Sequence, residues 1–105
     1  MEPNSKNSNF ASAKLDAADF TKTELSGANF YQAKLFKAIL FQANLSESNF
    51  IEADLMGANI SSSDLTGADL SRCSLVEANL IGSNLTDANL QDAKLGGRFT
   101  REGYF

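Results

Sequence analysis

The stretch that decides the fold is residues 28–60, which read ANFYQ-AKLFK-AILFQ-ANLSE-SNFIE-ADLMG-ANI. A large apolar residue returns at every fifth position of this stretch, beginning at Phe30. Two positions before each of these residues stands a small one, which is Ala in most repeats. The same spacing continues in both directions without a gap, from Phe10 to Leu95. We call the large apolar residue the centre of its repeat.

The five-residue period fits neither of the regular secondary structures. Five residues of α-helix turn by about 500°, so successive centres would lie about 140° apart and wrap around the helix. Five residues of a strand reverse the face on which the side chain lies. The period therefore predicts a chain that extends briefly and turns every five residues, with the small residue and the centre pointing inward. One repeat is too short to bury a core, so we expect an all-β solenoid of stacked coils.

The turns and their glycines follow from the same pattern. Glycine stands two residues after the centre in four repeats, at Gly27, Gly57, Gly67 and Gly82. Glycine adopts positive φ at no steric cost, so these positions are expected to form some of the turns between the extended pieces.

Composition and charge exclude several classes of protein. The 105 residues carry 13 acids and 9 bases, for a net charge of −4. This balance argues against sequence-independent nucleic-acid binding, which needs clustered Lys and Arg. No run approaches the roughly 20 apolar residues of a membrane span. A single cysteine, and no apolar stretch behind the N-terminus, lead us to expect a cytoplasmic protein without a disulfide.

The sequence also lacks the groups on which most catalytic sites depend. It contains no His, the commonest general base and metal ligand. Cys73 occupies the inward small position, which predicts a buried and inert thiol rather than a nucleophile. No glycine-rich phosphate loop or zinc-ligand spacing is present. A solid core would leave no interior pocket. We therefore expect no enzyme, and no catalytic, cofactor or metal site.

The repeat resembles that of the pentapeptide-repeat family, Ala-(Asp/Asn)-Leu followed by two variable residues. The matching triplets include Ala28-Asn29-Phe30, Ala43-Asn44-Leu45, Ala53-Asp54-Leu55, Ala68-Asp69-Leu70, Ala78-Asn79-Leu80 and Ala88-Asn89-Leu90. The resemblance implies a right-handed quadrilateral β-helix of about four and a half coils, with four repeats in each coil. It covers residues 8–97, which leaves a polar segment 1–7 and an aromatic tail 98–105. It also implies a protein-interaction or structural module and points toward cyanobacteria, where such proteins are abundant.

With four repeats in a coil, residues twenty apart lie on one face. We number the faces by their first centres: Phe10 begins the first face, Leu15 the second, Phe20 the third and Leu25 the fourth. The outward residues sort by face. The fourth face is polar in the position after the centre, with Ser26, Ser46, Thr66 and Thr86. On the second face the same position reads Asp16, Phe36, Met56, Val76 and Gly96, and the third face adds Phe41 and Ile81, with Ile39 between them and Phe36. The apolar residues of this stripe form the candidate partner-binding set: Phe36, Ile39, Phe41, Met56, Val76 and Ile81. Such a stripe is typical of a site for a protein partner or a weak homodimer. The alternative is ordinary surface, much of which is apolar in any protein.

The charge is uneven along the chain. Residues 47–92 hold eight acids and one base, Arg72, for a net charge of −7. This segment is either a solvated surface or a means of steering a basic partner. It also supports a second function, an acidic DNA mimic that binds a topoisomerase, which a resemblance to the fluoroquinolone-resistance members of the family suggests. The tail, with Phe99, Tyr104 and Phe105, is expected to cap the last coil or to form a dimer contact.

Overall fold

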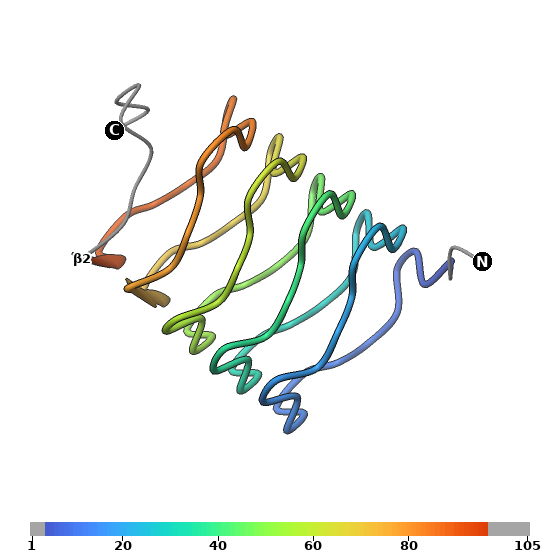
Figure 1. The fold of residues 1–105 in the computed structure, drawn as a ribbon, viewed down its shortest axis with the longest axis horizontal. Coiled ribbons are helices and arrows are strands. Elements are labelled where there is room, and N and C mark those ends of the chain that lie inside the picture. Colours follow the sequence, from blue (N-terminus) through green and yellow to red (C-terminus); the bar gives the residue numbers. More distant parts are fainter. Residues whose placement is uncertain (1–3, 97–105) are drawn as a thin grey trace.

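The computed structural model describes residues 4–96, and these form a stack of similar coils that runs from the N-terminus to the C-terminus (Figure 1). The described part of the chain contains no helix. Two of its extended segments are long enough to be strands, β1 (Ser74–Val76) and β2 (Lys94–Gly96). They pair in parallel, with Leu75 opposite Leu95.

The coils stack in a register of twenty residues. Every isolated bridge between coils joins residues twenty apart in parallel, from Asn4 with Glu24 to Asp69 with Asn89. Each repeat is also held by several backbone hydrogen bonds; for example, the Leu35 N–H donates to the Asp54 carbonyl, at 2.8 Å. A coil therefore contains four five-residue repeats. The predicted all-β quadrilateral β-helix is confirmed.

Each repeat ends in a tight turn that closes on the next small residue. The carbonyl of the centre accepts a hydrogen bond from the N–H three residues later, as between Phe30 and Ala33 at 2.9 Å. The residue two after the centre has positive φ in every repeat from Asn7 to Asp92. This is the geometry of a type II turn. Only four of these positions are glycine, so the sequence predicted a minority of the turns. At the others, the bonds to neighbouring coils hold an ordinary residue in the left-handed region.

The Asn or Asp before the centre has a structural role that the sequence pattern did not reveal. Its side-chain Oδ1 accepts a hydrogen bond from the backbone N–H two residues later. All twelve such residues between Asn9 and Asn89 make this bond, at 2.8–3.1 Å. That N–H points away from the stacked backbone, so the side chain supplies the acceptor that the backbone ladder does not. We call this contact the Asx cap.

The core is a solid stack of the inward residues. The centres from Leu25 to Leu80 are buried, as are the small residues between them. Phe10, Phe30 and Phe50 stack face to face, with centroid separations of 5.0 and 4.7 Å. Inward serines are satisfied as well: the Ser48 hydroxyl donates to the Leu45 carbonyl at 2.5 Å. No buried side-chain polar atom of the described residues lacks a partner.

The first coil begins earlier than the expected boundary at residue 8. The Ser5 N–H donates to the Glu24 carbonyl and Asn7 has the turn conformation, so the first coil begins before residue 8. At the other end, Leu95 is a centre and yet 45% exposed, because it lies in the last described coil. The predicted aromatic tail, residues 98–105, lies outside the described residues.

Candidate interaction surface

The turn that joins the second face to the third carries the apolar column. Phe36, Met56 and Val76 each follow a centre by one residue, and backbone bonds hold them one above another. The Lys37 N–H donates to the Met56 carbonyl and the Gly57 N–H donates to the Val76 carbonyl, both at 2.9 Å. The three side chains are therefore stacked as the sequence predicted. We call this column, with the residue after each member, the 36/56/76 corner.

The next turn along each coil, between the third and fourth faces, carries the other corner. It consists of Phe41, Ser61 and Ile81, with the Ser62 N–H donating to the Ile81 carbonyl at 2.9 Å. Ser61 thus separates the two apolar residues that the sequence placed together. Ile39 lies on the third face between the two corners. The predicted residues are therefore brought to one side of the rod, but as two columns and a single side chain between them.

The exposure of these side chains is uneven. Phe36, Ile39 and Met56 are 37–39% exposed and Ile81 is 41% exposed. Phe41 and Val76, which complete the two columns, are less exposed and are half-buried. Two further contacts orient Phe36. Its backbone N–H donates to Asp16 Oδ1 at 3.3 Å, and the Lys37 ammonium lies 5.3 Å from the ring centroid.

The third face carries no charge over three successive coils. Residues 38–42, 58–62 and 78–82 include no Asp, Glu, Lys or Arg. The eight acids of residues 47–92 all belong to the other three faces: Glu52, Asp69 and Asp92 to the first, Asp54 and Glu77 to the second, and Glu47, Asp64 and Asp87 to the fourth. Along the sequence, residues 47–92 form one acidic segment. The twenty-residue register instead divides it and leaves one side neutral.

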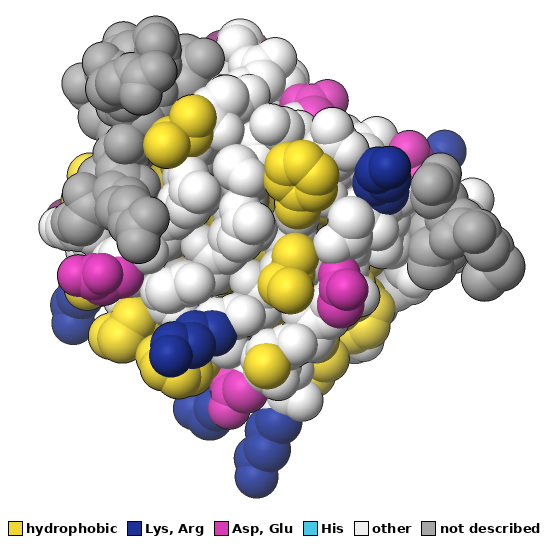
Figure 2. Space-filling model, in the orientation of Figure 1, with side chains coloured by type: hydrophobic (Ala, Val, Ile, Leu, Met, Phe, Trp, Pro, Cys, Tyr) yellow, Lys and Arg dark blue, Asp and Glu magenta, His cyan; other side chains and the backbone are white. Residues whose placement is uncertain are grey.

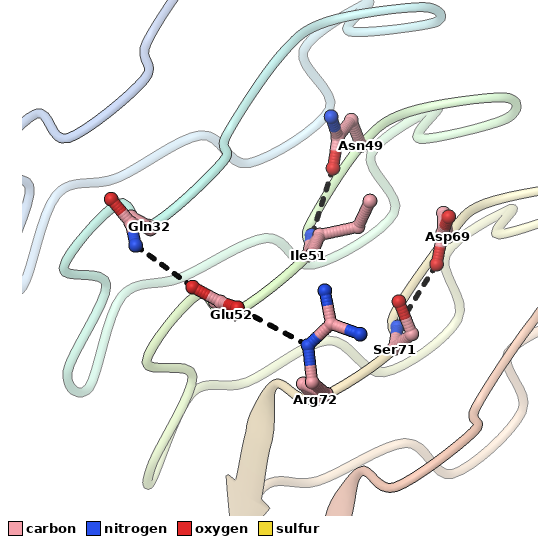
Figure 3. A network of polar contacts seen from close by, with 7 residues as sticks. All are labelled: Gln32, Asn49, Ile51, Glu52, Asp69, Ser71 and Arg72. Atoms are coloured by element: carbon pink, nitrogen blue, oxygen red, sulfur yellow. Dashed lines mark hydrogen bonds and ion pairs between the residues drawn. The ribbon is translucent and has the colours of Figure 1, made fainter.

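Several acids are engaged within the rod. Glu52 accepts hydrogen bonds from Gln32 at 2.8 Å and from Arg72 at 3.1 Å, so three side chains of successive coils form a ladder (Figure 3). The bonds from Gln32 and then from Arg72 lower the pKa of Glu52. Asp69 uses one oxygen to cap the N–H of Ser71, at 3.0 Å. These contacts reduce the number of free carboxylate oxygens on the first face.

Hydrophobic side chains do not merge into one broad patch on the side of the molecule drawn in Figure 2. They stand there in separate groups between polar side chains and backbone. The candidate residues likewise form two columns with Ile39 between them rather than one wide apolar area, so charge and shape must contribute to recognition.

The next features are those that a catalytic or metal site would need: a reactive thiol, a cluster of metal ligands and a cavity. Cys73 is fully buried, and burial raises the pKa of its thiol to about 12, so the reactive thiolate is scarce at neutral pH. Within residues 4–96 no three Asp, Glu, Cys or His side chains are grouped so as to hold a metal ion, and no cavity opens. None of the described segments is a helix with the length and apolar character of a membrane span.

The repeat register and the comparisons with known proteins agree. Eight copies of the signature described as pentapeptide repeats match residues 6–40, 40–72 and 63–97. The chain belongs to the pentapeptide-repeat family. Among curated proteins, none has a significantly similar sequence.

Solved structures of pentapeptide-repeat proteins resemble the rod. One is a pentapeptide repeat protein from the thylakoid lumen of Arabidopsis thaliana, 30% identical, with a TM-score of 0.58. The match covers 87% of this chain but 60% of that protein, so this chain spans less than two thirds of its length. Another is Rfr23 from the cyanobacterium Cyanothece 51142, 29% identical over 94% of this chain and 84% of that one, with a TM-score of 0.46. A trypsin-treated form of QnrB1, a plasmid-mediated fluoroquinolone resistance protein, is 18% identical over 86% of this chain and 61% of that one. Its TM-score of 0.51 supports the shared fold alone.

The sequence reasoning missed two charged residues at the 36/56/76 corner. Lys37, Gly57 and Glu77 each follow a member of the apolar column, and the same register stacks them. Lys37 and Glu77 are exposed, and neither takes part in an ion pair among the described residues. The twenty-residue spacing already places Lys37, Gly57 and Glu77 in one column of the sequence.

Proposed function

We propose that this chain is a non-enzymatic protein-interaction module that binds a protein partner through the third face and the 36/56/76 corner. The observation that carries the proposal is the uncharged third face, bordered by Phe36, Met56 and Val76, on a rod whose other faces hold all eight acids of its central segment. Interface centres are depleted in charged residues and enriched in aromatic residues and Met, as this side is.

The rigidity of the rod favours such a role. Each outward residue is held in place by backbone bonds to its neighbouring coils, so little order has to be gained on binding. Burying several hundred Å² of apolar surface contributes about 10 kcal/mol at ~25 cal/mol per Å², and the loss of translational and rotational freedom offsets much of it. A partner of micromolar rather than nanomolar affinity is expected.

The acidic DNA-mimic function, with a topoisomerase as partner, has one observation in its favour, the net charge of −7 over residues 47–92. The arrangement of the acids weakens it. They are spread over three faces, Glu52 is paired with Arg72, and Asp54, Asp64 and Asp69 each use one oxygen in an Asx cap. A continuous acidic face that could replace a phosphate backbone is not formed, so we favour the uncharged side.

A comparison of two triple variants tests the proposal. Phe36, Met56 and Val76 are replaced together by Ser, and in the control variant Ser46, Thr66 and Thr86 of the fourth face are replaced by Ala. Both sets point outward, so both variants should keep the circular dichroism spectrum of the wild type. Proteins that the wild type captures from its host should be lost with the first variant and kept with the control. Capture that survives the first variant, or fails with the control, would contradict the proposal.

A further inference from the structure

The 36/56/76 corner is complementary to itself when the order of the coils is reversed. Its apolar column runs Phe36, Met56, Val76, and the column beside it runs Lys37, Gly57, Glu77. Reversal about the middle coil places the largest side chain opposite the smallest, and the cation opposite the anion. Self-complementarity of this kind is what a twofold interface requires, because each contact is then made twice.

We propose that the surface formed by this corner and the third face binds a second copy of the chain, with the two rods antiparallel about a twofold axis at the middle coil. This deepens the proposed function and rests on it, since it names the partner of the same surface. In this arrangement Phe36 packs on Val76 of the second copy and Met56 packs on Met56. Lys37 pairs with Glu77 of the second copy, and the pair recurs on the other side of the axis.

The other corner fits the same axis. Phe41 meets Ile81 of the second copy, so apolar meets apolar, and Ser61 meets Ser61. Gly57 lies at the middle coil, between the two charged residues, and a Cβ at this position would lie 3.2 Å from Lys37 Cγ of the same chain. Its φ of +70° also makes other residues unfavourable there. A parallel pairing is poorer, because it sets Met56 against Ser61 and leaves Lys37 opposite the uncharged Gln42.

Charge explains why a second copy would use this side. Each chain carries a net charge of −4, so two copies repel when acidic faces approach. The third face is uncharged over three coils, and the corner supplies one cation and one anion that match across the axis. Lys37 and Glu77 are exposed and not paired with each other or with other described residues, so both are available for a second copy.

The size of the surface predicts a weak dimer. Three coils at ~4.8 Å each span roughly 14 Å along the rod, and the rod is 24 Å wide. Each copy would then bury roughly 350 Å², well below the ~800 Å² per partner of a standard stable interface. Self-association is therefore expected between micromolar and millimolar concentrations, where the ion pairs also make it sensitive to salt.

Sedimentation equilibrium from roughly 10 µM to 1 mM, at low salt, tests the inference with a charge-reversal cycle. Lys37→Glu and Glu77→Lys should each weaken dimerisation by about tenfold or more, because each places like charges together twice. The double variant Lys37→Glu with Glu77→Lys keeps the net charge of the wild type and should restore the dimer. Glu47→Lys, on the fourth face, is the control for Glu77→Lys and should not weaken it.

The results separate the inference from the function on which it rests. A wild type that stays monomeric throughout, or a double variant no better than the singles, would overturn the antiparallel dimer. If the same chain still captures a host protein that the Phe36, Met56 and Val76 triple variant loses, the interaction module stands and only its partner is different. If capture is also unaffected by the triple variant, the proposed function fails as well.

A disulfide crosslink tests the same dimer independently. With Cys73 replaced by Ser, Met56→Cys should form a disulfide-linked dimer on oxidation and Thr66→Cys should not.

Discussion

The Asx caps allow a prediction about stability that depends on a single oxygen atom. In the middle of the rod, Asp64 Oδ1 accepts two hydrogen bonds, from the Thr66 N–H at 2.9 Å and from the Thr66 hydroxyl at 2.6 Å. Asp64 and Thr66 belong to the fourth face, and Thr66 lies on its turn toward the first face rather than on its turn toward the third. Replacing Asp64 by Ala removes the acceptor and leaves the N–H to water, whereas Asp64→Asn keeps an oxygen in the same place and removes only the charge.

The magnitude follows from similar contacts at helix N-termini. Loss of a side-chain acceptor for a backbone N–H typically costs about 1 kcal/mol, with a range of 0.5–2 kcal/mol. Because the hydroxyl bond is lost as well, we expect Asp64→Ala to cost about 1–2 kcal/mol of unfolding free energy. In a domain of this size 1 kcal/mol shifts Tm by roughly 4–8 °C. Asp64→Asn should stay within about 0.5 kcal/mol of the wild type.

The assay is urea denaturation followed by circular dichroism, with a thermal melt of the same three proteins. A second position tests the opposite sign. Lys14 precedes its centre where most repeats have Asn or Asp, and among the described residues nothing accepts the Asp16 N–H. Lys14→Asn should therefore stabilise the rod by about 0.5–1 kcal/mol relative to Lys14→Gln, which removes the same charge without forming the cap. Equal losses for Asp64→Asn and Asp64→Ala would refute the reasoning, because the acceptor oxygen would then be irrelevant.

Three further predictions concern the core, the thiol and one carboxylate. Leu55 is fully buried, so Leu55→Ala should lower the free energy of unfolding by about 2–5 kcal/mol and Leu55→Asp should unfold the rod. Thr66→Asp, on the outside, should change the thermal melt little. Similar losses at Leu55 and Thr66 would contradict the assignment of inward and outward residues. Cys73 is buried with a pKa raised to about 12, so a thiol reagent should label it only in denaturant at pH 7–8, and fast labelling of the native protein would contradict its burial. The bonds from Gln32 and Arg72 lower the pKa of Glu52, so the stability that Glu52 contributes is present above its unfolded-state pKa and is lost as the pH falls through its folded-state pKa. Arg72→Ala should raise the pKa of Glu52 in an NMR titration. An unchanged pKa would show that the ion pair is not formed in solution.

Much of the fold could be predicted from the sequence, because the period is strict. The five-residue spacing identified the inward centres, and the burial of Leu55 and Cys73 follows from position alone. The resemblance to pentapeptide repeats added the four-sided coil. The turns were predicted less well: glycine indicated four of them, whereas positive φ at residues such as Gln42 is imposed by bonds to neighbouring coils, which no local pattern reports.

The candidate site was predictable only in part for the same physical reason. Stacking of Phe36, Met56 and Val76 follows directly from residues twenty apart. The interruption of Phe41 and Ile81 by Ser61, and the corner formed by Lys37 and Glu77, depend on comparing every outward position between coils. The role of Asn and Asp before the centre depends on which backbone N–H groups the ladder leaves free. That is a property of the assembled coil and not of one repeat.

The most direct test of the central claim, that the uncharged third face and its bordering corner are the binding surface, is a map of amide chemical shifts. ¹H–¹⁵N spectra of the labelled chain would be recorded at rising concentration and again with any captured partner. The account predicts that the shifted amides cluster in residues 36–42, 56–62 and 76–82, and that those around Ser46, Thr66 and Thr86 stay in place. Shifts centred on the fourth face, or distributed along the acidic residues 47–92 without regard to face, would contradict it.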